Sequence, residues 1–246
     1  KELGSEIRNM FVAAPGHVLV DADYSQIELR LLAHISGDET MKNAFLTGED
    51  IHAVTASQVF GVPLGDVTAQ MRSHAKAVNF GIVYGISAFS LAQDIGVRPR
   101  EAQAYIDAYL EKYHGVREYM ERVIAEAKAN GYVSTLYGRR RPMPELKSPN
   151  RNMRAFGERV ARNMPIQGTA ADIMKLAMVN VHRRMRAEGL ESRLILQVHD
   201  ELIAECPERE AERVKALLEE EMSGAAKLSV PLTANAKIGR SWAEAH

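Results

Sequence analysis

Two apolar runs near the end of the chain predict a β-hairpin with acidic side chains at its tip. Segment 194–205 reads LILQVHDELIAE, in which the apolar runs flank His199, Asp200 and Glu201. Apolar runs of about 4–8 residues rich in β-branched side chains are typical of strands buried on at least one face. A solvated turn is the simpler interpretation of this segment alone, because aspartate often occupies turns. A second, similar junction far upstream favours a functional hairpin.

That junction lies in segment 17–38, HVLVDADYSQIELRLLAHISGD, which predicts a strand over 17–20 and a helix over 25–36 ended by Gly37. Side chains alternate faces along a strand, so Asp21 and Asp23 point the same way, and Asp23 lies at the strand's end. If this strand pairs with the hairpin, Asp23 and Asp200 meet at one sheet edge, where like charges require cations or raised pKa values. Two divalent metal ions about 3.5–4 Å apart would form a phosphoryl-transfer site there.

Segment 70–85, QMRSHAKAVNFGIVYG, predicts a helix with four functional candidates on one face. Arg72, Lys76, Phe80 and Tyr84 recur every fourth residue, and such positions drift by only about 40° per step. Two cations would hold a polyphosphate, and the two rings would pack a sugar and a base. For any two of these residues, solvated cations and core aromatics remain the simpler interpretation. Two isolated residues, Glu28 and His52, are more simply interpreted as ordinary surface or packed side chains. The sequence pattern alone leaves their roles open.

Segment 139–162 is the basic part of a chain that is otherwise nearly balanced in charge. It holds eight arginines and lysines against two glutamates, whereas the net charge of the whole chain is −1. Its cations would follow phosphates and make binding depend on salt, although a solvated face is the alternative. Within it and just beyond, Arg159, Asn163 and Gln167 recur every fourth residue. Amide side chains there would reach a minor groove without reading sequence.

The remaining pattern is mainly helical. Helices are expected over 100–113 and 116–130, as scaffold, and over 208–222, before a last strand over 230–238. Pro165 and Gly168 are expected to break the helix that follows the basic segment. Thr169 and Asp172 resemble a capping box that restarts it as far as about Gly189.

Composition sets outer limits on these expectations. Of 246 residues, 46% are hydrophobic and 26% are charged, which is typical of a soluble globular protein and compatible with two lobes. No apolar run approaches the ~20 residues that span a bilayer. Cys206 is the single cysteine, so an internal disulfide is excluded, and a reducing, cytoplasmic location is expected.

Three segments together resemble the signature motifs of family A DNA polymerases, of the bacterial DNA polymerase I type. They read DADYSQIELR, RSHAKAVNFGIVYG and LQVHDEL, in the family's order and spacing, and ERVARNMPIQGTAADIMK is similar to a further conserved helix pair. The resemblance implies an α+β, right-hand fold. An antiparallel palm sheet would come from 1–36 and 149–246, and mainly helical fingers from 37–148. The family's thumb and exonuclease-like domains precede its palm and are not found here, so the chain is expected to be a C-terminal palm and fingers portion.

The resemblance also implies roles for individual residues. The metal ligands would be Asp23, Asp200 and the backbone carbonyl of Tyr24, and the catalytic residues would be Asp23 and Asp200 with Glu201 and Lys76. Glu28 would exclude a ribose 2′-OH. The nucleotide-binding residues would be Arg72, Lys76, Phe80, His52, Glu28 and Gln26. Those that contact DNA would be Tyr84, Arg159, Asn163, Gln167 and His199.

The implied function is template-directed DNA synthesis in replication and repair. A primer 3′-OH would attack a dNTP on primer–template DNA with two Mg²⁺ ions, in a monomer that contacts no membrane. A single-subunit RNA polymerase is one alternative, but that resemblance would not supply Glu28 in a DYSQIE context, nor Phe80 where that family carries tyrosine. A catalytically weak DNA-binding fragment is the other.

Overall fold

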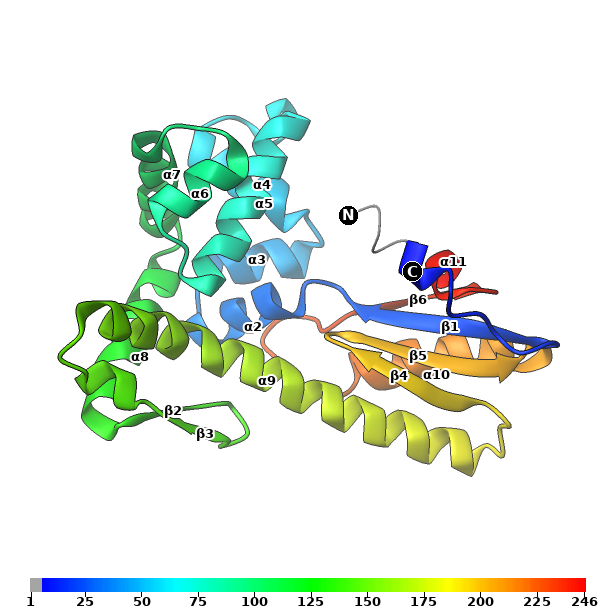
Figure 1. Ribbon diagram of the computed structural model, residues 1–246. Helices are drawn as coiled ribbons and strands as arrows, with labels where there is room; N and C mark the ends of the chain where they lie inside the picture. Colours follow the sequence, from blue (N-terminus) through cyan, green and yellow to red (C-terminus); the bar gives the residue numbers. More distant parts are fainter. Residues whose placement is uncertain (1–5) are drawn as a thin grey trace. The chain divides into compact units, whose positions relative to one another are not determined.

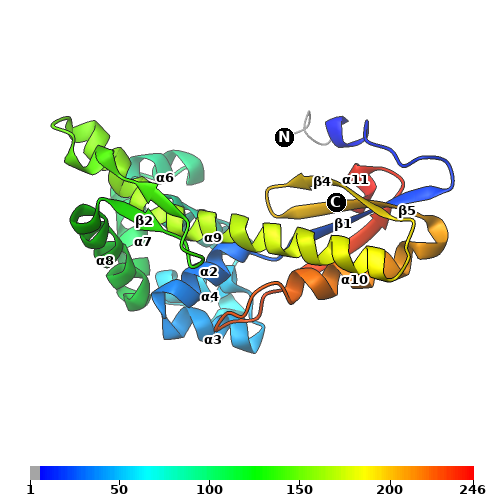
Figure 2. The ribbon, with the colours of Figure 1, turned by 90° about the horizontal axis from the view of Figure 1, so that it is seen from below.

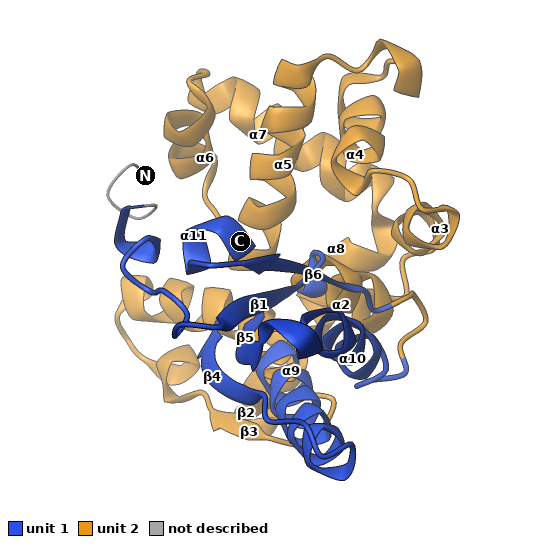
Figure 3. Ribbon diagram, turned by 90° about the vertical axis from the view of Figure 1, so that its right-hand side faces the viewer, with its two compact units in different colours: residues 1–27, 170–227, 232–246 blue, residues 28–169, 228–231 orange. Residues whose placement is uncertain are grey.

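The computed structural model describes residues 6–246 (Figure 1). The chain forms two compact units, coloured separately in Figure 3. The first comprises 1–27, 170–227 and 232–246, and the second 28–169 and 228–231. The first five residues of the expected palm range 1–36 lie outside the described residues. Within the described residues, no helix is both long and apolar enough to cross a membrane.

A four-stranded antiparallel sheet forms the centre of the first unit, with strand order β4-β5-β1-β6. The hairpin is confirmed, because β4 (Arg193–Val198) and β5 (Glu201–Pro207) pair directly. β1 (His17–Tyr24) lies between β5 and β6 (Ala234–Gly239). A strand from the start of the chain is therefore inserted beside a hairpin almost two hundred residues later in the sequence (Figure 1).

The two faces of β1 serve different purposes. One face is covered by α10 (Ala211–Ser223), which follows the short 3₁₀ turn η3 (Glu208–Glu210) (Figure 2). The residues of β1 on this face are almost fully buried, namely Val20, Ala22 and Tyr24. The Tyr24 hydroxyl donates a 2.8 Å hydrogen bond to the carbonyl of Met222 and so joins β1 to the end of α10. The opposite face carries Asp21 and a small apolar cluster formed by Leu19, Ile203, Trp242 and Ala245. The last two belong to α11 (Trp242–Ala245).

The second unit is mainly helical. Its elements before the basic segment are α2 (Ile27–Ser36, whose first residue belongs to the first unit), α3 (Glu39–Thr47), α4 (Ile51–Phe60), η1 (Leu64–Asp66), α5 (Ala69–Tyr84), α6 (Ala88–Ile95), α7 (Pro99–Lys112) and α8 (His114–Asn130). A short hairpin follows, made by β2 (Tyr132–Ser134) and β3 (Arg140–Pro142), and then η2 (Pro144–Lys147) and α9 (Arg151–Ala187).

Local sequence fixes the ends of four consecutive helices in this unit. The side chains of Asp38, Asp50, Thr68 and Ser87 accept hydrogen bonds from the first-turn N–H groups of α3, α4, α5 and α6. Each of the four helices then ends at a glycine in the left-handed region. Such caps satisfy N–H groups that a helix leaves unpaired, and glycine adopts the left-handed ending without a steric cost.

A buried polar network fixes the packing of α4 against its neighbours. The Thr55 hydroxyl lies 3.0 Å from the Tyr113 hydroxyl and hydrogen-bonds with the side-chain amide of Asn79 on α5. All three residues are fully buried. Since buried polar groups are costly when unpaired, the network specifies one arrangement of these helices.

The expected break at Pro165 and Gly168 is wrong, because α9 continues from Arg151 to Ala187 with Pro165 inside it. A proline inside a helix removes one backbone hydrogen bond at a cost of about 3 kcal/mol. Buried residues on both sides, Ala161 and Ile166, hold the helix in place. Thr169 does not cap a new helix. Its hydroxyl donates to the Pro165 carbonyl at 2.5 Å and accepts the N–H of Leu136 at 3.1 Å.

The last strand also differs from expectation. It begins at Ala234 rather than at residue 230, and Pro231 lies before it. The compact units divide within α2 and α9, whereas the partition into palm (1–36 and 149–246) and fingers (37–148) stays a prediction.

We expect Gly115→Ala to lower the free energy of unfolding by about 1–3 kcal/mol, although alanine normally favours a helix. Gly115 is the second residue of α8, and a Cβ there would lie 2.8 Å from the Cα of Asp38, whose side chain accepts the Gly115 N–H at 2.9 Å. Urea unfolding of the two proteins measures the difference. Gly65→Ala is the matched control, because a Cβ at Gly65 meets nothing within 4 Å. Equal stability of both variants would contradict the close packing of α8 on Asp38.

Candidate active site

The register of β1 and β5 gathers acidic side chains at one end of the sheet. Asp23 lies directly opposite Glu201, and the N–H of Tyr24 donates to the carbonyl of Asp200 at 3.1 Å. His199 adopts φ 50° in the hairpin turn, in the left-handed region. The tip of the hairpin is thereby tied to the end of β1, and Asp23, Asp200 and Glu201 come together.

The acids perturb one another. The pKa of Asp23 is raised to about 7 by burial and by the negative charges of Asp200, Glu201 and Asp21. By its surface area Asp23 is an exposed residue, so we consider repulsion from the three neighbours the decisive cause. The pKa of Asp21 is raised to about 6, mainly by burial and by Glu201. Four carboxylates therefore share a small region in which full ionisation is unfavourable.

This donor set fits a divalent cation. Oδ1 of Asp21 and Oε2 of Glu201 are buried and have no hydrogen-bond partner in the described part of the chain. Carboxylate oxygens are the ligands that Mg²⁺ and Mn²⁺ prefer. A bound cation would offset the repulsion that otherwise favours a proton on Asp23.

In the second unit, α5 presents the ridge expected from the sequence. Arg72, Lys76 and Tyr84 are exposed and Phe80 is half-buried. The opposite face of α5 is core, and its buried residues include Ala75, Val78 and Ile82. The helix therefore uses one face for packing and leaves a cation-to-aromatic ridge on the other.

His52 lies at the start of α4 and packs beside this ridge. Its ring centroid is 5.8 Å from that of Phe80, and its Nδ1 lies 3.1 Å from the side-chain nitrogen of Asn79. Only 2% of the residue is exposed, and burial lowers the pKa of His52 to about 4. The imidazole is neutral at pH 7. Since Nδ1 accepts the Asn79 amide, Nε2 carries the proton and is the group that can donate to a ligand.

Asp50 connects this histidine to the ridge. One carboxylate oxygen caps α4 by accepting the N–H groups of His52 and Ala53, at 2.9 and 3.2 Å. The other accepts Nε of Arg72 at 2.7 Å. Arg72 is therefore oriented before any ligand binds, with part of its guanidinium still exposed.

Glu28, in the first turn of α2, is oriented by the other end of the ridge. The Tyr84 hydroxyl donates a 2.8 Å hydrogen bond to Oε2 of Glu28. The hydrogen bond holds the carboxylate at the C-terminal end of α5, next to the aromatic residues.

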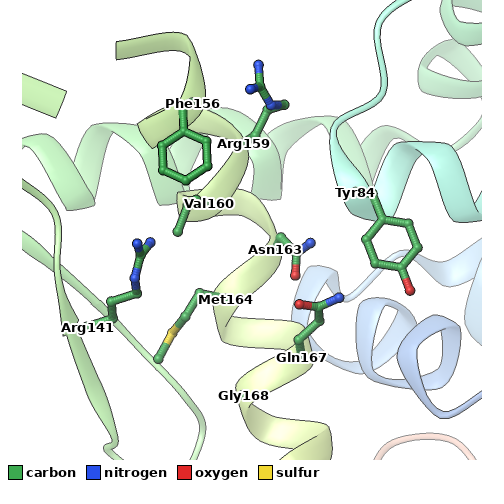
Figure 4. Close-up of a pocket in the computed structure, with 9 residues that line it drawn as sticks. All are labelled: Tyr84, Arg141, Phe156, Arg159, Val160, Asn163, Met164, Gln167 and Gly168. Atoms are coloured by element: carbon green, nitrogen blue, oxygen red, sulfur yellow. The ribbon is translucent and has the colours of Figure 1, made fainter. Parts of the chain in front are cut away.

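An open groove of about 590 Å³ lies between the end of α5 and α9 (Figure 4). Asn163 and Gln167 extend from α9 on the side of Tyr84, whereas Arg141 reaches it from β3. Oδ1 of Asn163 is buried without a hydrogen-bond partner in the described structure. The groove thus offers amide groups, a phenol and guanidinium groups to a polar ligand.

The comparisons with known proteins agree over nearly the whole chain. Residues 1–244 match the family model described as DNA polymerase family A. The chain belongs to this family. It is 53% identical over 98% of its length to DNA polymerase I of Caldicellulosiruptor bescii, and 53% identical over 99% to DNA polymerase I of Pseudomonas aeruginosa. These matches cover 28% and 27% of the relatives, so the chain spans less than a third of their length.

A solved structure shows the same fold. The POL domain of Pol1 from M. smegmatis, in a complex with DNA primer-template and dNTP, aligns with a TM-score of 0.94 and 46% identity. The alignment covers 100% of this chain and 43% of that one. The expected α+β, right-hand polymerase fold is confirmed.

In this family A chain, the structure groups most residues that the motifs single out. Asp23, Asp200 and Glu201 meet in the first unit. The residues on or beside α5 in the second unit are Arg72, Lys76, Phe80, His52, Glu28 and Tyr84. The groove is lined by Arg159, Asn163 and Gln167. Gln26 lies just after β1 with φ 55°, and His199 is exposed in the turn. The roles of all these residues stay predictions. Tyr24 itself is buried, so only its backbone is open to a metal role.

Sequence reasoning missed Asp50, Asn79 and His246. A signal for Asp50 exists, because an aspartate directly before an apolar run is typical of a helix N-cap. No local signal indicates that the same carboxylate binds Arg72, since the two residues are 22 positions apart. Asn79 lies on the core face of α5, where the pattern favours an apolar residue.

We expect the stabilising effect of His52 to decrease as pH falls. Because the folded pKa is about 4 and the unfolded value is about 6.5, only the unfolded chain takes up a proton between these values. Relative to His52→Gln, the free energy of unfolding should therefore fall by up to about 1.4 kcal/mol per pH unit below pH 6.5. Urea titrations of both proteins at several pH values measure this difference. His182→Gln, at an exposed position, is the control. A difference between wild type and His52→Gln that does not change with pH would contradict the buried, neutral imidazole.

Proposed function

We propose that this chain carries the nucleotidyl-transfer site of a DNA-directed DNA polymerase, which adds a dNTP to a primer 3′-OH on a DNA template. The observation that carries the proposal is the meeting of Asp23 and Asp200 beside Glu201 at the end of an antiparallel sheet. The family supports it, as does the similarity to a polymerase domain described with DNA primer-template and dNTP.

Asp23 and Asp200, with the backbone of Tyr24, would hold two Mg²⁺ ions. Bound there, the ions would activate the primer 3′-OH and stabilise the charge on the departing pyrophosphate. The share of the protein is to place two carboxylates close together and to hold them with the hydrogen bond from the Tyr24 N–H to Asp200. Glu201 adds negative charge beside them, which strengthens the attraction for cations.

The ridge on α5 would bind the incoming nucleotide. Arg72 and Lys76 would make charge-assisted hydrogen bonds with the triphosphate, helped by the Nε2–H of His52. Asp50 reduces the cost of ordering Arg72, because it already holds Nε. Phe80 would pack against the sugar and base. Glu28, held by Tyr84, would occupy the space that a ribose 2′-OH needs.

The groove would contact the DNA duplex near the new base pair. Arg159 would contact phosphate, and Asn163 and Gln167 would reach minor-groove acceptors, which are similar in all base pairs. Contacts of this kind position the duplex without selecting a sequence. A role in replication and repair, and a cytoplasmic, monomeric protein, belong to the same proposal.

Replacing Asp23 or Asp200 by asparagine should lower the rate of primer extension by at least about 100-fold, because each change removes a charged metal ligand. Extension of a labelled primer with Mg²⁺ and dNTPs measures the rate, and a gel-shift titration measures primer–template binding, which should be retained. Asp66→Asn is the control, at an exposed acid in η1. Undiminished extension by either variant would refute the two-metal assignment. Primer–template binding without extension by the unmodified chain would favour a DNA-binding fragment.

Glu28→Ala should raise the ratio of ribonucleotide to deoxyribonucleotide incorporation by about 10-fold or more, because the removed side chain opens space for a 2′-OH. Tyr84→Phe keeps the carboxylate but removes the hydrogen bond that orients it, so its effect should be smaller and in the same direction. Single-nucleotide extension with dNTP and with rNTP gives the ratio, and Glu49→Ala on the exposed turn before α4 is the control. An unchanged ratio in Glu28→Ala would remove the proposed role. Preference of the unmodified chain for rNTPs would instead indicate an RNA polymerase.

A further inference from the structure

A second group of possible metal ligands lies on the same face of the sheet as Asp23. Asp21 of β1, Glu201 of β5 and His246, just after α11, offer ligand atoms that all lie within 4.8 Å of one another. Nδ1 of His246 is 3.4 Å from Oδ2 of Asp21 and 3.5 Å from Oε1 of Glu201. The three side chains thus converge from three separate segments of the first unit.

The carboxylates in this group lack the partners that their burial requires. Asp21 is 3% exposed and Glu201 8% exposed, and each retains one buried oxygen without a hydrogen bond in the described residues. Besides His246, the groups beside their other oxygens are the indole N–H of Trp242, 3.2 Å from Asp21, and a guanidinium nitrogen of Arg8, 4.0 Å from Glu201. Two adjacent buried carboxylates with free oxygens are costly unless a cation is bound.

We propose that Asp21, Glu201 and His246 form a binding site for a divalent transition-metal ion, for which Zn²⁺ is the best-matched candidate. Nitrogen and oxygen donors lie about 2.0–2.2 Å from zinc, so two donors at a tetrahedral angle are about 3.3–3.6 Å apart. The separations of 3.4 and 3.5 Å from His246 fall within this interval. One imidazole with two carboxylates suits zinc better than Mg²⁺, which prefers oxygen ligands alone.

The site is distinct from the proposed pair at Asp23 and Asp200. Asp21 and Asp23 are two residues apart on one strand, which separates their Cα atoms by about 6.4–6.8 Å. The group of Asp21, Glu201 and His246 includes neither Asp23 nor Asp200. Glu201 would lie between the two sites, since Asp23 is directly opposite it in the register.

Neighbouring groups hold the ligands in place. The indole of Trp242 orients Asp21 in the way that outer hydrogen bonds orient metal ligands. Nζ of Lys237 donates to the backbone carbonyl of His246 at 2.6 Å, which fixes the histidine beside the sheet. A bound ion would therefore fasten the segment after β6 to β1 and β5.

Calorimetric titration of the whole chain with ZnCl₂, in excess MgCl₂, tests the site. We expect a binding event that His246→Ala weakens at least 10-fold, because one of three ligands is lost. His246→Ala removes only an exposed side chain, so the variant should fold, and circular dichroism checks this. His182→Ala, at an exposed histidine of α9 in the same unit, is the matched control and should leave the affinity unchanged.

The variant Asp200→Asn tests whether this site is distinct from the proposed pair at Asp23 and Asp200. The zinc-binding event that depends on His246 should persist in Asp200→Asn. In a separate measurement, Co²⁺ added in place of zinc should give a visible absorption band that His246→Ala removes. Three results would overturn the proposal: no zinc binding to the unmodified chain, unchanged zinc affinity in His246→Ala, or loss of the event in Asp200→Asn with retention in His246→Ala. The first two would leave a simple ion pair between His246 and the acids. The last would place the ion at the pair instead.

Discussion

The pairing register of β1 with β5 is the constraint on which the rest of the first unit depends. It sets Asp23 opposite Glu201 and places the hairpin tip next to the end of β1. Because side chains alternate along a strand, a slip of one residue would turn the acids into the α10 core and expose Val20 and Ala22. The apolar face of β1 therefore determines where the carboxylates lie, and burial of that face opposes the repulsion among them.

This repulsion makes the region a favourable place for cations. Asp23 and Asp21 have pKa values raised to about 7 and about 6, because burial and neighbouring carboxylates disfavour their charged forms. Protons and metal ions are alternative ways to reduce the repulsion, and metal ions leave the carboxylates ionised and able to bind. The unpaired oxygens of Asp21 and Glu201 point to the same need.

A feature of this arrangement can be predicted from the sequence when the pattern that indicates it lies within one short segment. The hairpin, the strand that carries Asp23 and the α5 ridge all arise from local periodicity. The continuous α9 does not, because a local rule for Pro165 cannot include the packing of Ala161 and Ile166. The contact of His246 with Asp21 also has no local signal, since it depends on how the segment after β6 folds back onto β1.

The residues that sequence patterns revealed share a physical property. On β1 and on α5, one set of positions packs against the core while the other set carries the charged side chains of the candidate site, so a single period encodes both stability and chemistry. Asp50 and Asn79 are different. Asp50 caps one helix and binds Arg72 on the next, and Asn79 is buried on the core face of α5 and bonds to His52. Their contribution is to orient Arg72 and His52, the groups proposed to contact the nucleotide. A residue that acts through a neighbour distant in the sequence leaves no periodic trace, so its role becomes visible only when the two elements are packed together.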